Sequence, residues 1–208
     1  MNACLRLLPR FCLVASARFG AAWLTAAEPV QLNWLGQSPA PTATGVSWGV
    51  PWPKGAVKKD QRFNLASAAG EALPLQTWPL AYWPDGSLKW SGFATVAGPD
   101  AAGPFTLAAG DTTGGGGGSV RVRRSDTGVE IDTGKLKARL TDWGGALIDS
   151  MWVEGREVVR NARLVCIRQH GPDGAGEESP VREKFLGRTT RVTVEQAGPV
   201  RAVLKVEG

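Results

Sequence analysis

Residues 45–55 read GVSWGVPWPKG, and residues 78–90 read WPLAYWPDGSLKW. Five of the nine tryptophans fall in these two stretches, each close to a proline, a glycine or a turn. They are Trp48, Trp52, Trp78, Trp83 and Trp90. Indole rings beside tight turns suit two roles, the core of a small β-barrel or a platform for sugar rings. The two stretches therefore indicate a β-protein and leave both roles open.

The second stretch predicts a β-hairpin. Strands are expected over residues 74–83 and 87–97, joined by Pro84-Asp85-Gly86. Proline presets φ, aspartate bonds to its own backbone and glycine tolerates a positive φ, so this tripeptide favours a turn. Because side chains alternate along a strand, we expect Trp78 and Trp90 in the core, with Trp83 and Lys89 facing elsewhere.

The remaining sequence predicts further strands. Glycine (27 residues) and proline (14 residues) are frequent, which favours short strands and turns over long helices. Apolar residues alternate in many short segments, and no long segment has helical periodicity. We therefore predict an all-β chain with a first domain over residues 28–111 and a second over residues 120–208. The glycine-rich segment 112–119 lacks the Lys-Ser/Thr pair of a phosphate-binding loop and is interpreted as a linker.

The first 27 residues resemble a signal peptide. Arg6 and Arg10 precede an apolar, small-residue stretch that ends at Thr25-Ala26-Ala27, a sequence typical of a cleavage site. Arg18 interrupts the apolar stretch, so a disordered N-terminus is the alternative interpretation. We expect a secreted or periplasmic protein. No run of about 18 apolar residues occurs, so no membrane span is predicted.

Removal of this leader changes the charge and the cysteine content. Lys+Arg falls from 24 to 21 against 19 Asp+Glu, so the net charge drops from +5 to +2, which argues against a nucleic-acid partner. Cys4 and Cys12 leave with the leader. Cys166 remains in an apolar V-C-I context and is predicted to be a buried thiol, so neither an intrachain disulfide nor a cysteine metal cluster is expected.

Few residues suggest catalysis. His170 is the single histidine, and no G-x-S-x-G elbow accompanies it, so a loop histidine is the favoured interpretation. Acids cluster at Glu177-Glu178 and around Asp142, Asp149 and Glu154. Such carboxylates serve glycoside hydrolysis or calcium binding in other proteins, but solvated acids are favoured here. We predict no cofactor and no metal site, with calcium left open.

A basic cluster of Lys54, Lys58 and Lys59 follows Trp52. Cations pair with uronate carboxylates while indoles cover sugar C–H faces, so this cluster suits an acidic sugar polymer; a solvated loop is the alternative. The candidate substrate-binding residues are Trp48, Trp52, Lys54, Trp83 and Lys89.

The residues also resemble a known family. GVSWGVPWPKG, LPLQ at 73–76 and WPDGSLKW at 83–90 resemble the N-terminal barrel of the exo-rhamnogalacturonan lyase (PcRGLX/YetA-like) family. IDTGKLKARL at 131–140, GREVVRNARLV at 155–165 and VEQAGPVRAVLKVEG at 194–208 resemble the start of its central β-sandwich. The resemblance implies a small RIFT-type β-barrel followed by an incomplete antiparallel β-sandwich, with a C-terminal α/α toroid beyond this sequence.

The resemblance implies β-elimination in a pectic polysaccharide. A base removes the C5 proton of galacturonate while a cation or acid neutralises its carboxylate, and the C4–O bond breaks. Lys89 and Tyr82 have suitable chemistry, but the hairpin accounts for both, and no catalytic residue is assigned. We expect an N-terminal fragment that is inactive alone and contacts acidic plant cell-wall polysaccharide; the alternative is a non-catalytic carbohydrate-binding or scaffold module.

The sequence stops directly after an alternating strand, at Val206-Glu207-Gly208. From this we expect a truncated reading frame that lacks the toroid. A sandwich cut at that point would leave unpaired strand edges, so poor solubility or edge-to-edge association is also predicted.

Overall fold

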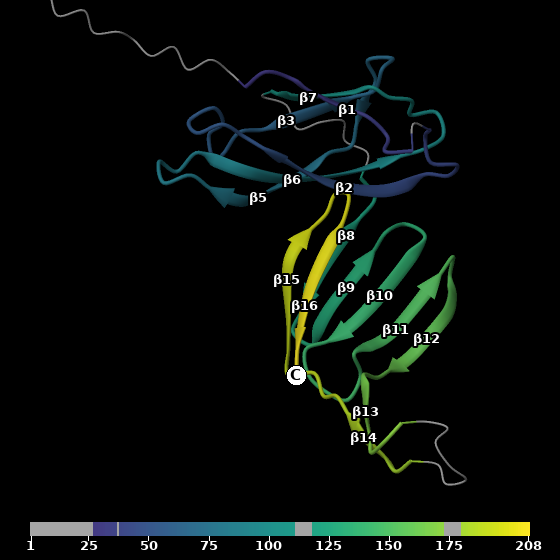
Figure 1. Ribbon diagram of the computed structural model, residues 1–208. Helices are drawn as coiled ribbons and strands as arrows, with labels where there is room; N and C mark the ends of the chain where they lie inside the picture. The colour runs from purple at the N-terminus through teal and green to yellow at the C-terminus, as the bar shows by residue number, and fades with distance from the viewer. Residues whose placement is uncertain (1–26, 37, 111–117, 173–179) are drawn as a thin grey trace, which may run out of the picture.

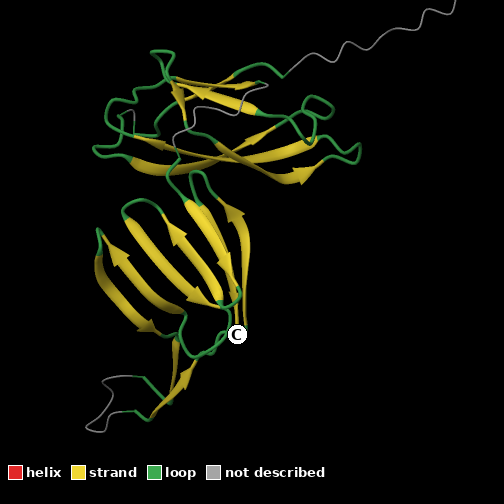
Figure 2. Cartoon of the chain, turned by 180° about the vertical axis from the view of Figure 1, so that it is seen from behind, coloured by secondary structure: helices red, strands yellow, loops and turns green. Residues whose placement is uncertain are grey.

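The computed structural model describes residues 27–36, 38–110, 118–172 and 180–208. Within these ranges every regular element is a β-strand, and all strand pairs are antiparallel, which confirms the all-β prediction (Figure 2). No helix occurs there, so this part of the chain contains no helical segment able to cross a membrane. The predicted leader and the run of five glycines fall almost wholly outside the described residues.

The first domain consists of two small sheets, one above the other (Figure 1). Buried side chains from both sheets form a single core. One sheet has the strand order β1-β7-β3-β4 and the other β2-β6-β5. The strands are β1 (Val30–Leu32), β2 (Thr44–Pro51), β3 (Phe63–Ala66), β4 (Ala72–Leu73), β5 (Gln76–Tyr82), β6 (Leu88–Ala97) and β7 (Phe105–Ala109).

Aromatic rings form the centre of this domain. Phe93 on β6 is fully buried and contacts Trp48, Trp52 and Phe63 with ring centroids 5.1–6.5 Å apart. Burying a side chain of this size contributes about 2–3 kcal/mol. Leu65 and Leu107 complete the core from the opposite sheet, so the two sheets are held together by residues of both.

The second domain is built on one meander of five strands, ordered β12-β11-β10-β9-β8. Its strands are β8 (Arg121–Ser125), β9 (Gly128–Asp132), β10 (Leu136–Thr141), β11 (Ile148–Val153) and β12 (Arg156–Ala162). A hairpin of β15 (Arg191–Ala197) and β16 (Ala202–Glu207) packs against it through Val192, which joins Val129, Ala138 and Leu140 in a small core. Five strands thus face only two, the arrangement predicted as an incomplete sandwich.

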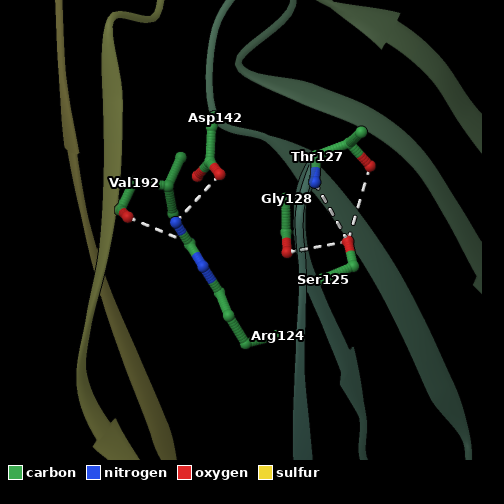
Figure 3. A network of polar contacts seen from close by, with 6 residues as sticks. All are labelled: Arg124, Ser125, Thr127, Gly128, Asp142 and Val192. Atoms are coloured by element: carbon green, nitrogen blue, oxygen red, sulfur yellow. Dashed lines mark hydrogen bonds and ion pairs between the residues drawn. The ribbon is translucent and has the colours of Figure 1, made fainter.

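A polar bridge ties this hairpin to the large sheet (Figure 3). Arg124 on β8 donates to the backbone oxygen of Val192 on β15 at 3.1 Å and to Asp142 Oδ2 at 2.8 Å. The second oxygen of that carboxylate, Oδ1, is buried with no partner among the described residues. Because β8 and β15 share no ladder hydrogen bonds, the arginine replaces them at this edge.

A separate hairpin of β13 (Val165–Gln169) and β14 (Arg182–Leu186) projects from the second domain (Figure 1). Its apolar residues Val165, Ile167 and Phe185 are exposed. Cys166 is exposed as well, so the prediction of a buried thiol is wrong. Most side chains of both strands are exposed, because no other described element packs against this hairpin.

The two domains meet where the tip of the β15–β16 hairpin reaches the β2-β6-β5 sheet (Figure 1). Gln76, at the start of β5, accepts hydrogen bonds on Oε1 from the backbone N–H groups of Val200 and Arg201 at 3.0 and 2.9 Å. Its Nε2 donates to Gln196 Oε1 at 3.4 Å. Since Gln76 is only 8% exposed, its amide is committed to this contact between domains.

Candidate functional site

The turn between β5 and β6 forms as the sequence predicts. Gly86 has φ of 83°, and Asp85 Oδ1 accepts hydrogen bonds from both the backbone N–H and the hydroxyl of Ser87. These bonds stabilise the ionised carboxylate and lower the pKa of Asp85, to which Lys54 adds a smaller Coulombic effect. The turn is therefore a rigid end to the hairpin.

Three of the predicted binding residues gather at this end of the hairpin. Trp83 Nε1 donates to the backbone oxygen of Trp52 at 3.0 Å, which fixes the indole, and Lys89 Nζ lies 4.8 Å from the centroid of the Trp83 ring. The backbone N–H of Gly55 donates to Ser87 Oγ at 2.9 Å, so the loop that carries Lys54 is fastened to the same turn. Lys89, the fixed indole of Trp83 and the loop that carries Lys54 thus lie together at this end of the hairpin.

Trp52 occupies a different environment from the one predicted for a substrate-binding residue. It is 6% exposed, donates from Nε1 to Ser91 Oγ at 3.0 Å and stacks on Phe63 with centroids 5.3 Å apart. Its ring faces the core, where a glycan has no access, so we do not include it in a surface site. Its backbone oxygen still positions Trp83.

Trp48 lines a cavity of about 510 Å³ between β2 and the loop that follows β1. Its indole stacks on Phe93 at 5.8 Å, and its Nε1 is buried without a partner in the ranges that the structure describes. Trp34 and Phe105 form other walls of the cavity, which is mainly apolar. Trp48 thus lies away from the cluster formed by Lys54, Trp83 and Lys89.

Trp78 and Trp90 lie on the outer face of the β2-β6-β5 sheet, so the prediction that both are core residues is wrong. Trp90 is 42% exposed and Trp78 is half-buried. Their indoles occupy the space where side chains at Gly49 and Gly92 would stand, because a Cβ at either glycine would collide with the ring. These glycines pair directly across β2 and β6, a register that the structure shows and that the spacing of the sequence does not give.

Arg201 of the second domain reaches this outer face. Its guanidinium carbon lies 4.6 Å from the centroid of the Trp78 ring, and Nη1 donates to Ser47 Oγ at 3.3 Å. Within the described residues no carboxylate pairs with it. Two tryptophans of the first domain and a cation of the second therefore adjoin one another, in a region that the sequence motifs do not indicate.

The acids and the histidine form no comparable centre. His170 Nε2 lies 3.1 Å from Glu183 Oε1 on the exposed β13–β14 hairpin, and Asp142 is paired with Arg124. Glu177 and Glu178 fall outside the described residues. Over residues 27–36, 38–110, 118–172 and 180–208, no group of three His, Cys, Asp or Glu side chains has the spacing of a metal site.

Comparison with protein families gives a match for each domain. Residues 28–110 match the PcRGLX-like N-terminal RIFT barrel domain, and residues 120–208 match the PcRGLX-like protein central β-sandwich domain. The chain belongs to the PcRGLX-like family. The resemblance inferred from the sequence motifs is thereby confirmed, as is the order of a RIFT barrel followed by a β-sandwich.

A bacterial relative supports the same assignment. The uncharacterized protein YetA of Bacillus subtilis (strain 168) is 34% identical over 182 residues, which cover 86% of this PcRGLX-like chain. The match covers 20% of YetA, so the chain spans about a fifth of the length of this relative.

Proposed function

We propose that this chain supplies the glycan-binding β domains of a protein that acts on pectic, rhamnogalacturonan-type polysaccharide by β-elimination. Membership of the PcRGLX-like family supports the substrate class. The observation that carries the proposal is the ammonium group of Lys89 above the fixed indole of Trp83, with Lys54 on the adjoining loop.

This arrangement suits an acidic sugar polymer chemically. Galacturonate units present a carboxylate and an apolar C–H face, and Lys89 with Trp83 presents a cation beside an aromatic face. Neutralising the carboxylate is also what β-elimination needs, because it stabilises the charge that develops when a base removes the C5 proton. We assign binding to this chain and place the base in the remainder of a longer protein, consistent with the length of YetA.

Binding and lysis are tested separately. The chain over residues 28–208 is run in affinity gel electrophoresis against rhamnogalacturonan and against a neutral galactan, and retardation by the acidic polymer alone is expected. Lys89→Gln should weaken binding roughly twofold to fivefold, the range of an exposed ion pair between the ammonium group and a uronate carboxylate. Lys184→Gln on β14 removes the same charge outside the cluster and should have no effect.

Lysis is followed by the ultraviolet absorbance of the unsaturated uronate product. A full-length relative that contains both β domains should form this product from rhamnogalacturonan, whereas residues 28–208 alone should not. A well-folded full-length protein with no product would refute the lyase part of the proposal and leave the binding part standing.

A second candidate function is a scaffold that orients another domain. It is favoured by the burial of Trp52 in the barrel core and by the buried amide of Gln76 between the two domains, because both side chains stabilise the fold and neither is accessible to a ligand. A folded chain that binds neither the acidic nor the neutral polymer would select this function over glycan binding.

Export is part of the proposal, because a cell-wall polymer is too large to enter a cell. The leader-like residues 1–27 support it. Fractionation of cells that express the whole sequence with a C-terminal tag should place the protein in the periplasm or medium, with its N-terminus at Glu28. Retention in the cytoplasm would contradict export.

A further inference from the structure

The outer face of the β2-β6-β5 sheet is prepared for flat aromatic rings. Gly49 and Gly92 are paired across β2 and β6, and both lack the side chain that would lift an indole from the sheet. Trp90 and Trp78 take up that space. The Trp90 ring lies over Gly49 and the Trp78 ring over Gly92. Because these two glycines are direct partners across β2 and β6, the two indoles cover neighbouring positions on the same face of the sheet.

The second domain adds a cation to this aromatic surface. Arg201 lies in the turn before β16, and the hydrogen bonds that the backbone N–H groups of Val200 and Arg201 donate to Gln76 Oε1 hold that turn against the barrel. The guanidinium uses one ring face of Trp78 and one serine hydroxyl. It is partly buried and has no carboxylate partner in the described ranges, so most of its five N–H donors are available to an oxyanion.

We propose that Trp90, Trp78 and Arg201 form a second glycan-binding site, composed of both domains, which binds a uronate-containing oligosaccharide. The exposed indole of Trp90 covers the C–H face of one sugar ring. Arg201 pairs with the carboxylate of a neighbouring unit, where its planar fork fits both oxygens. Gln76 is a positioning residue, because it fixes the turn that carries the arginine and does not touch the ligand.

This inference rests on the proposed function for its ligand class and adds a site that is distinct from the Lys54–Trp83–Lys89 cluster. Charge complementarity indicates what binds here. The guanidinium of Arg201 is partly buried, has no carboxylate partner among the described residues and lies near the exposed indole of Trp90. A ligand that suits both groups carries an anion and an apolar face. A purely apolar partner, such as a second copy docking through Trp90, would leave Arg201 unpaired. The experiment must therefore distinguish self-association of the chain from glycan binding.

The experiment uses residues 28–208 and a galacturonate-rhamnose oligosaccharide, with affinity measured by calorimetry. The same oligosaccharide with its carboxylates reduced to alcohols is the neutral probe. Trp90→Ala should weaken binding of both probes roughly threefold to tenfold. Arg201→Gln should weaken binding of the acidic probe roughly tenfold and leave the neutral probe unchanged, whereas Arg201→Lys should retain part of the acidic preference.

Matched controls lie in the second domain, away from the site. Trp143→Ala removes an indole that is 69% exposed, and Arg156→Gln removes an exposed guanidinium; neither should change affinity for either probe. Light scattering on each variant reports self-association. A dimer that Trp90→Ala dissolves, without glycan binding, would overturn the site.

The outcomes distinguish the two proposals. If the wild-type chain binds neither probe, the proposed function fails and this site with it. If it binds the acidic probe, loses affinity in Lys89→Gln and is unaffected by Trp90→Ala and Arg201→Gln, the composite site alone is refuted. If Arg201→Gln lowers the affinity for the acidic and the neutral probe equally, the arginine does not bind a carboxylate, and the composite site is also refuted.

Discussion

The side-chain oxygen of Gln76 accepts a hydrogen bond from the backbone N–H of Val200 at 3.0 Å across the boundary between the two domains. The two residues are 124 positions apart in the chain. A buried amide that satisfies backbone groups of another domain makes the relative placement of the domains specific, because no apolar side chain could pair those N–H groups.

Replacing Gln76 with leucine should destabilise the protein by about 1–3 kcal/mol, because buried N–H groups lose their acceptor. Denaturant unfolding gives the free energy, and limited proteolysis reports whether the segment between the domains becomes more susceptible. Gln31→Leu is the control, since the exposed bond from Gln31 to Thr106 should matter little. Equal effects of the two substitutions would contradict the role given to Gln76.

Gly92→Ala should displace the Trp78 indole, because the new Cβ collides with the ring. The expected cost is about 1–3 kcal/mol, typical of overpacking. Trp78→Ala in the same chain should remove most of that cost, since the methyl group then has space. A double-mutant cycle by thermal unfolding checks this coupling. Additive losses would show that the glycine is not required by the indole.

The carboxyl group of Asp85 should titrate with a pKa below its ordinary value of 3.8, because Ser87 donates two hydrogen bonds to the carboxylate. With the folded-state pKa lowered, the turn is stabilised above the unfolded pKa, and this contribution is lost as the pH falls through the folded pKa. NMR titration of the carboxyl carbon measures the midpoint. Ser87→Ala should move it upward; an unchanged midpoint would contradict the assigned cause.

Cys166 should react with a thiol reagent in the folded protein as quickly as in denaturant, because its side chain is exposed on the β13–β14 hairpin. The chain over residues 28–208 carries only this cysteine, so one equivalent of reagent is expected. Cys166→Ser should show no reaction. Protection of the native thiol would indicate that another surface covers the hairpin in solution.

Local chemistry made the β5–β6 hairpin predictable. The Pro84-Asp85-Gly86 turn and the flanking alternation gave strands at 74–83 and 87–97, and the structure has them at Gln76–Tyr82 and Leu88–Ala97. The direction of the tryptophans was not predictable from alternation alone, which separates two faces without saying which is buried. Register shifts around Ala81 also interrupt the simple alternation of side chains along β5.

Contacts between distant segments account for the remaining errors. Arg201 adjoins Trp78 because the β15–β16 hairpin docks on the barrel, and no spacing in the sequence encodes that contact. Cys166 sits in an apolar strand, yet burial depends on what packs against a strand as well as on its composition. Trp52 was chosen for its proximity to Lys54, but its ring points into the core.

The contact between Gln76 and the 198–201 turn has a consequence for biosynthesis. All strands of the barrel leave the ribosome before the hairpin that supplies Val200 has been translated. A barrel that folds in this order keeps the amide of Gln76 hydrated until the last hairpin docks, and docking then closes that surface as a late event of assembly.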